Sequence, residues 1–184
     1  MTTMTVMPHA VERWTVADLE KTPADGLRYE LIDGILHVSP APRPIHQGVG
    51  GELFRLLADA APATMKAFYA PLDWQPDHLT SMQPDLLVVR RADVRERNVV
   101  APLLLAVEVL SPSTRRYDEV LKASVYAEHE VASYWIVDPD EPSIVAYDLA
   151  GDRYVEVGRA SGDQSVTLTT PFEVTVTPNA LVSG

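Results

Sequence analysis

The chain contains no cysteine, no long apolar run and few basic residues. Without cysteine it can form no disulfide, no thiolate-ligated zinc site and no cysteine nucleophile. This absence is compatible with a reducing compartment, and the cytoplasm is the predicted location. No run of roughly 18 or more apolar residues occurs, so we predict no membrane-spanning helix. Residues 1–10 lack a basic region followed by an apolar run, so they do not resemble a signal peptide.

The composition is strongly acidic. Lys and Arg total 15 against 26 Asp and Glu, which gives a formal net charge of −11. Proteins that coat nucleic acid through bulk charge are basic, so this composition disfavours that class. It leaves room for a nuclease, in which metal ions and a few local arginines contact the phosphates. The 184 residues fit one domain with a sizeable core, predicted at 14–184 after a flexible leader at 1–13.

Apolar periodicity and turn-forming residues predict an α/β (α+β) fold. Asp33-Gly34 between two apolar-rich runs predicts a hairpin of residues 27–32 and 35–39. Helices are predicted at 45–61 and 117–129. One or two strands are predicted over 65–70 and 72–75, and further strands at 85–90, 103–110 and 133–138. This α-β-β-β-α-β order predicts a mixed sheet flanked by helices. Another hairpin is expected at 143–149 and 153–157, around Ala150-Gly151-Asp152, with short strands at 166–168 and 172–176.

Local features add three expectations. Thr15 begins a short helix, with Asp18 three residues later in a capping box. Glycines in the first half of the 45–61 helix favour either close packing or a late start: Gly48, Gly50 and Gly51. The 117–129 helix is predicted to carry Val120, Leu121, Ser124 and Val125 on one face.

Two carboxylates stand where a charge is costly. Asp85 opens one predicted strand, and Glu108 lies inside the otherwise apolar run Leu103–Leu110. Burying an uncompensated charge is strongly unfavourable, and a shared divalent cation would compensate both groups. Such a cation would polarise a phosphoryl oxygen and lower the pKa of a bound water, while Lys122 orients that water or stabilises charge. The structural alternatives are a turn cap for Asp85, a buried ion pair for Glu108 and a solvated helix lysine for Lys122.

Other polar residues near these positions allow two interpretations each. His46 would contact phosphate or act as a base, or it would cap the start of a helix. Arg115 and Arg116 would bind a phosphate backbone, or they would be solvated loop charges. Ser111, Ser113 and Thr114 are interpreted as loop and helix caps, because no histidine that could activate a nucleophile lies near them in the sequence.

A series of ordered motifs covers most of the chain, from about Trp14 to Leu181. In chain order they are Tyr29-Glu30-Leu31-Ile32-Asp33-Gly34, His46-Gln47, Pro84-Asp85, Val107-Glu108-Val109-Leu110-Ser111-Pro112-Ser113-Thr114, Lys122 with Tyr126, and Tyr134-Trp135-Ile136-Val137-Asp138-Pro139. This series resembles the Uma2 family of endonucleases, formerly a domain of unknown function, in the PD-(D/E)xK nuclease superfamily. The resemblance implies a restriction-endonuclease-like core with added β-hairpins at both ends.

The resemblance also implies a metal site for Mg²⁺ or Mn²⁺. Asp85 matches the aspartate of the PD motif, Glu108 matches the second acid, and the main-chain carbonyl of Val109 would be a third ligand. The motif lysine is expected at position 110, where this chain has Leu110. Lys122 matches a lysine displaced onto the following helix, where Tyr126 would share its face.

A further acidic ligand is implied by the same resemblance. Glu30 matches the acid of the early hairpin motif and is the preferred candidate to complete the site. Glu52 on the first long helix is its rival, because many nucleases of the superfamily place an acid there.

The predicted function is metal-dependent hydrolysis of phosphodiester bonds in DNA, with a homodimer suited to cutting both strands of a duplex. Two rivals remain at this point. One is a catalytically silent protein-interaction module, which the net charge of −11 favours. The other is a metal-dependent hydrolase of small phosphate esters, which a closed pocket would favour.

Overall fold

The computed structural model describes residues 13–111 and 117–183. The predicted leader therefore lies outside the described residues except for Arg13, and so do Ser113, Thr114, Arg115 and Arg116. Among the described helices, none is long and apolar enough to cross a membrane.

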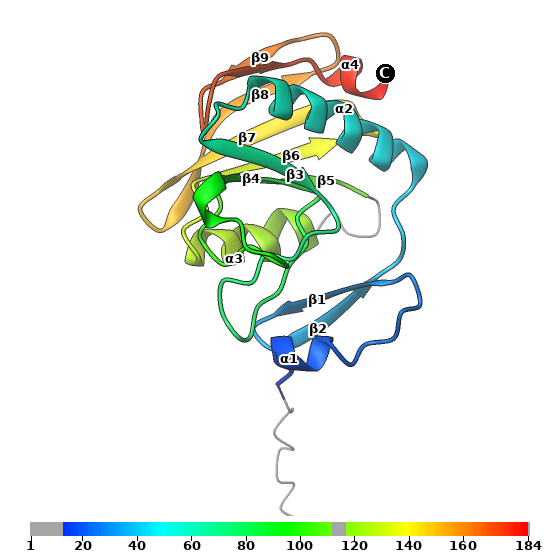
Figure 1. The fold of residues 1–184 in the computed structure, drawn as a ribbon. Helices are drawn as coiled ribbons and strands as arrows, with labels where there is room; N and C mark the ends of the chain where they lie inside the picture. The colour runs from blue at the N-terminus through cyan, green and yellow to red at the C-terminus, as the bar shows by residue number, and fades with distance from the viewer. Residues whose placement is uncertain (1–12, 112–116, 184) are drawn as a thin grey trace, which may run out of the picture.

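A six-stranded mixed sheet forms the centre of the molecule, with strand order β3-β4-β5-β6-β7-β8 (Figure 1). The strands are β3 (Met65–Tyr69), β4 (Leu86–Arg90), β5 (Leu105–Val109), β6 (Ser133–Asp138), β7 (Ser143–Ala150) and β8 (Arg153–Ser161). Only β5 and β6 run parallel within this sheet, and the other neighbours are antiparallel. A parallel pair needs a long crossover, which the segment containing α3 (Ala123–Glu128) supplies.

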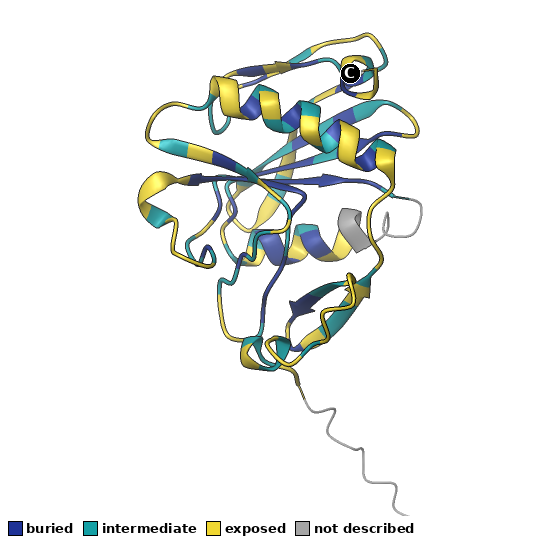
Figure 2. Cartoon of the chain, turned by 45° about the vertical axis from the view of Figure 1, so that its right-hand side comes forward, coloured by how far each residue is buried: buried dark blue, intermediate teal, exposed yellow. Residues whose placement is uncertain are grey.

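Helices cover both faces of the sheet. Helix α2 (Pro44–Ala60) packs on one face through Val49, Leu53 and Leu57, and α3 lies on the other (Figure 1). Alternate residues of β4 serve the two cores, because successive strand side chains point to opposite faces: Leu86 and Val88 join the α2 side, and Leu87 and Val89 the α3 side. Buried positions accordingly concentrate in the central strands (Figure 2). The order α2-β3-β4-β5-α3-β6 confirms the predicted α-β-β-β-α-β core.

The N-terminal hairpin lies on the α3 side of the sheet (Figure 1). Strands β1 (Arg28–Ile32) and β2 (Ile35–Ser39) are joined by Asp33 and Gly34, both with positive φ, as the Asp-Gly turn predicts. Two backbone hydrogen bonds between Leu31 and Ser81, each 2.8 Å, tie the hairpin to the segment that precedes β4. This attachment brings the side chains of β1 to one end of the central sheet.

The remaining elements are short. A second separate hairpin, β9–β10, has antiparallel strands and follows β8, so hairpins flank the core at both ends. Thr15 and Asp18 form the predicted capping box, in which the Thr15 N–H donates to Asp18 at 3.0 Å. The elements are α1 (Val16–Leu19), a 3₁₀ turn (Arg91–Asp93), β9 (Val166–Leu168), β10 (Val174–Val176) and α4 (Pro178–Val182).

Three local predictions were wrong. Residues 72–75 form no strand, and Trp74 makes only isolated bridges to Met82 and Val99. The glycines of α2 do not delay its start, because Pro44 occupies its first turn, where the fixed proline φ favours a helix. Asp85 directly precedes β4 and does not open the strand.

The helix predicted at 117–129 differs from the observed one in its first part. Residues Tyr117–Lys122 form a π-helical segment, and α3 begins only at Ala123. A π turn holds more residues than an α turn, so the side chains after it are rotated from the 3.6-residue pattern. Val120, Leu121 and Ser124, which the prediction placed on one face with Val125, are exposed. The buried positions are Lys122, Val125 and Tyr126.

The exposure of Val120 and the burial of Val125 lead to a prediction about stability. Val125→Ala should lower the free energy of unfolding by about 1–3 kcal/mol, because it removes buried methyl groups and leaves a cavity. The matched change Val120→Ala should alter it by less than about 0.5 kcal/mol, because Val120 is 69% exposed and Val125 only 5%. Urea unfolding of the two variants measures the difference, and equal losses would contradict the register.

Candidate metal and phosphate site

Glu108 lies in the middle of the buried strand β5 and is 1% exposed. The Tyr126 hydroxyl donates a hydrogen bond to its Oε1 at 2.5 Å. Lys122 Nζ lies 2.9 Å from its Oε2. Both partners come from the helical segment that crosses from β5 to β6, so the charge of this strand glutamate is compensated by its own crossover. A buried carboxylate requires such partners, because removing it from water is otherwise strongly unfavourable.

Lys122 links Glu108 to the N-terminal hairpin. Its ammonium group also lies 3.7 Å from Oε1 of Glu30, and its side chain is 2% exposed. Glu30 sits on β1, is itself 2% exposed, and accepts a hydrogen bond from the Gln83 N–H at 2.9 Å. Lys122 therefore lies between two buried carboxylates that are far apart in the sequence.

Asp85 lies where β4 begins, next to the end of β5. Leu86 pairs with Val107 in the β4–β5 register, which places Asp85 and Glu108 at the next positions of adjacent strands. Oδ2 of Asp85 accepts a hydrogen bond from the Val109 N–H at 2.9 Å and lies 3.0 Å from Nε2 of His46.

The other carboxylate oxygen of Asp85 is bound by Arg28. Nη1 and Nη2 of Arg28 donate to Oδ1 at 3.2 and 3.1 Å, and Nη1 also donates to the Gln83 carbonyl at 3.3 Å. Arg28 and Glu30 are alternate residues of β1, so they lie on the same face of that strand. The hairpin therefore contributes one cation and one carboxylate to the site.

These contacts shift the pKa values of the site. Burial would raise the pKa of Asp85, but the hydrogen bond and charge of His46, together with the charges of Arg28 and Lys122, lower it to about 2. Burial would lower the pKa of Arg28, yet the charges of Asp85, Glu30 and Glu108 raise it. Burial and the nearby charge of Glu108 raise the pKa of Tyr126 well above its ordinary value. Asp85 is therefore ionised at neutral pH, and Tyr126 stays a hydrogen-bond donor.

The structure brings together all four side chains that the sequence nominated as catalytic: Glu30, Asp85, Glu108 and Lys122. Tyr126 shares the buried face of Lys122, as expected. Glu52, the rival of Glu30, instead binds Arg55 at 2.8 Å on α2. Val109 enters the site through its N–H, and the ligand role of its carbonyl remains a prediction.

The structure defines the contacts of two further residues, His46 and Arg28. His46 lies within α2 and contacts Asp85, so it does not act as the cap of that helix; its buried Nδ1 has no hydrogen-bond partner in the structure. Arg28 was not nominated from the sequence at all. The sequence feature that could have identified Arg28 is the alternation of side chains along a strand, which places it on the same face of β1 as Glu30.

The donor set suits a divalent cation chemically. Asp85, Glu108 and Glu30 provide the hard carboxylate oxygens that Mg²⁺ and Mn²⁺ prefer. Within residues 13–111 and 117–183, however, no group of three or more His, Asp or Glu side chains is arranged to hold a metal ion. The carboxylate oxygens instead face Arg28, Lys122 and Tyr126. A bound cation would thus have to share these oxygens with the cationic side chains or displace those side chains.

A pocket of about 290 Å³ opens beside Asp85 along α2. Its lining residues are His46, Gln47, Gly50, Gly51, Phe54, Tyr69, Ala70 and Asp85. A Cβ added at Gly50 or Gly51 would meet no atom within 4 Å, so internal packing does not explain these glycines. Glycine in a helix interior costs about 1 kcal/mol relative to alanine. Because Gly50 and Gly51 have no side chains, they leave open space along one wall of this pocket, next to the buried carboxylate of Asp85.

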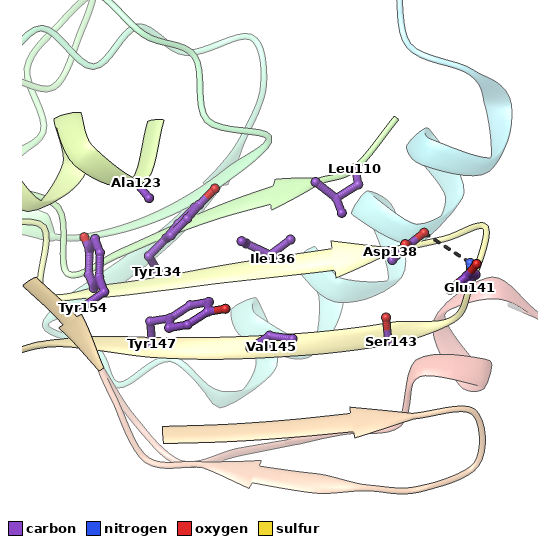
Figure 3. A pocket seen from close by; sticks show the side chains of 10 residues that line it. All are labelled: Leu110, Ala123, Tyr134, Ile136, Asp138, Glu141, Ser143, Val145, Tyr147 and Tyr154. Carbon is purple, nitrogen blue, oxygen red and sulfur yellow. Dashed lines mark hydrogen bonds between the residues drawn. The ribbon is translucent and has the colours of Figure 1, made fainter. Parts of the chain in front are cut away.

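A second pocket, of about 570 Å³, lies one strand beyond Glu108 (Figure 3). Ile136, the register partner of Glu108, lines it together with Tyr134 and Tyr147, whose stacked rings have centroids 6.5 Å apart. Its other end holds Asp138 and Glu141, where the Glu141 N–H donates to Asp138. Two acids at this end repel anions, whereas Arg28 and His46 lie on the side of Asp85.

Known proteins share this fold. A crystal structure described as a putative nuclease belonging to DUF820, from Anabaena variabilis ATCC 29413, matches with a TM-score of 0.72 and 20% sequence identity. The match covers 92% of this chain and 97% of that one, and at this identity it shows the fold. No curated protein matches the chain in sequence. The model of the family Uma2, described as "Putative restriction endonuclease", matches residues 16–179. Because that match spans most of the chain and confirms the resemblance of its motifs, the protein belongs to the Uma2 family.

Proposed function

We propose that this protein is a metal-dependent endonuclease that hydrolyses phosphodiester bonds in DNA. The observation that carries the proposal is the buried cluster of Glu30, Asp85, Glu108 and Lys122, which come from four separate segments of a chain that belongs to the Uma2 family. Structural stability alone gives no reason to collect three carboxylates in one place, because buried like charges repel and each is costly to desolvate.

The residues divide into ligands and positioning groups. Asp85, Glu108, Glu30 and the carbonyl of Val109 would hold Mg²⁺ or Mn²⁺. When bound, this cation would polarise a phosphoryl oxygen and lower the pKa of a water molecule. Lys122 stabilises negative charge on the phosphate or orients the attacking water. The Tyr126 hydroxyl fixes the orientation of the Glu108 carboxylate.

The two pockets indicate how a substrate approaches. The bare glycine wall of α2 leads to Asp85 and leaves space for a sugar-phosphate strand, whereas the pocket beyond Glu108 is acidic at one end. We therefore place the phosphate backbone along α2. A homodimer would present two such sites to a duplex.

Cleavage should depend on the carboxylates and on Lys122. Asp85→Asn, Glu108→Gln and Lys122→Met should each lower Mg²⁺-dependent cleavage of DNA by at least about 100-fold, the usual scale for removing a group that stabilises transition-state charge. Glu52→Gln is the matched control and should retain full activity, because Glu52 pairs with Arg55 on α2. The assay uses supercoiled, linear and single-stranded DNA with RNA as comparison, and Mn²⁺ calorimetry reports binding independently. Full activity in Asp85→Asn would refute the proposal.

The low pKa of Asp85 predicts how stability depends on pH. A carboxyl group whose pKa is lower in the folded protein stabilises it above the unfolded pKa, and this contribution is lost as pH falls through the folded pKa. For Asp85 the shift from 3.8 to about 2 places the loss between about pH 4 and pH 2. Over that range wild type should lose about 2 kcal/mol more stability than Asp85→Asn. Urea unfolding at several pH values measures this, and parallel pH profiles would contradict the shift.

The glycine wall can be tested with two equivalent substitutions in α2. Gly50→Leu and Gly48→Leu should both raise the free energy of unfolding by about 0.5–1 kcal/mol, because leucine favours a helix more than glycine does. Gly50 lines the pocket beside Asp85 and Gly48 does not. Only Gly50→Leu should therefore weaken binding of a DNA strand, as measured by fluorescence anisotropy. Equal affinities of the two variants would place the substrate elsewhere.

A further inference from the structure

Arg28 binds Asp85 in an end-on arrangement. Both of its terminal nitrogens donate to the single oxygen Oδ1, because the Val109 N–H and His46 occupy Oδ2. The guanidinium group therefore does not use the fork geometry with which arginine binds two oxygens of one anion. Arg28 is therefore free to form the two parallel hydrogen bonds of the fork geometry with another anion.

Arg28 and a divalent cation compete for the same oxygen. Asp85 is the proposed metal ligand, and two positive charges that share one carboxylate oxygen would repel each other strongly at this distance. The two cationic side chains of the site differ in their freedom to yield. Lys122 is 2% exposed and lies between Glu108 and Glu30, whereas the side chain of Arg28 is 20% exposed. Arg28 is thus the group that can turn away from the site.

Departure of Arg28 would leave the site in place. Asp85 keeps its contacts with the Val109 N–H and His46 on the other oxygen. The two hydrogen bonds between Leu31 and Ser81 hold the hairpin, so the change is confined to the Arg28 side chain. A phosphate group arriving beside Asp85 would offer this side chain two oxygens at once.

We propose, building on the function proposed above, that Arg28 is a substrate-binding residue that exchanges Asp85 for phosphate. When a divalent cation binds Asp85, the guanidinium group releases Oδ1 and binds non-bridging oxygens of the substrate phosphodiester. Arg28 thus neutralises Asp85 before the cation arrives and neutralises the substrate afterwards.

This exchange predicts opposite effects on two affinities. Arg28→Met should tighten Mn²⁺ binding, measured by calorimetry, by roughly tenfold, because the competitor for Asp85 is gone. The same variant should weaken binding of a hydrolysis-resistant phosphorothioate oligonucleotide, measured with saturating Mn²⁺, by roughly tenfold or more. Arg55→Met removes the same charge from an exposed pair with Glu52 and should change neither affinity.

A second measurement follows Arg28 directly in the wild-type protein. Nitrogen-15 labelling of arginine gives guanidinium signals, and the Arg28 signal is the one lost in Arg28→Met. Saturating Mg²⁺ should shift this signal, and the oligonucleotide should shift it again, while the Arg55 signal stays fixed. Mn²⁺ affinities that are equal in wild type and Arg28→Met, or an Arg28 signal unmoved by Mg²⁺, would overturn the exchange and leave the metal site standing. Absence of Mn²⁺ binding to either protein would overturn both proposals.

Discussion

The ion pair between Glu108 and Lys122 is the interaction on which the arrangement of the site depends. A glutamate in a fully buried strand cannot remain ionised without a partner at close range. Its partner arrives from the helical segment that precedes β6 in the chain. The π-helical segment Tyr117–Lys122 ends at Lys122, whose side chain is buried against Glu108, and Tyr126 follows one turn later.

The site is stabilised by the fold around it. Three carboxylates in one buried place repel one another, and His46, Arg28 and Lys122 offset the unfavourable surroundings of Asp85, because they lower its pKa to about 2 in spite of burial. Burial of apolar side chains in the cores on the two faces of the sheet offsets the free-energy cost of burying these charged groups. The cluster lies at one end of the sheet, where α2, β1, β4 and β5 meet. The charged groups are therefore separate from the apolar cores and close to the pocket beside Asp85.

Sequence patterns located most of the fold, since strands and turns are local signals. Residues 133–138 form the predicted strand, and Asp33-Gly34 forms the predicted turn. Long-range contacts were less accessible. No periodicity reveals that Arg28 meets Asp85, because the two are 57 positions apart and joined only by the attachment of the hairpin. The π turn was missed for a different reason: its sequence fits an ordinary helix, and the contacts of Lys122 at the end of this segment, with Glu30 and Glu108, are long-range.

The hairpin carries both Arg28 and Glu30, yet it forms its own two-stranded sheet outside the central one. Small two-stranded units are marginally stable by themselves, and such parts of a protein open locally at lower free energy than the whole molecule unfolds. Detachment at Leu31 and Ser81 would remove a cation and a carboxylate together and leave the local net charge unchanged. Such an opening would also expose Ile32, the hairpin residue that belongs to the core on the α3 side, so the hairpin couples the composition of the site to the packing of that core.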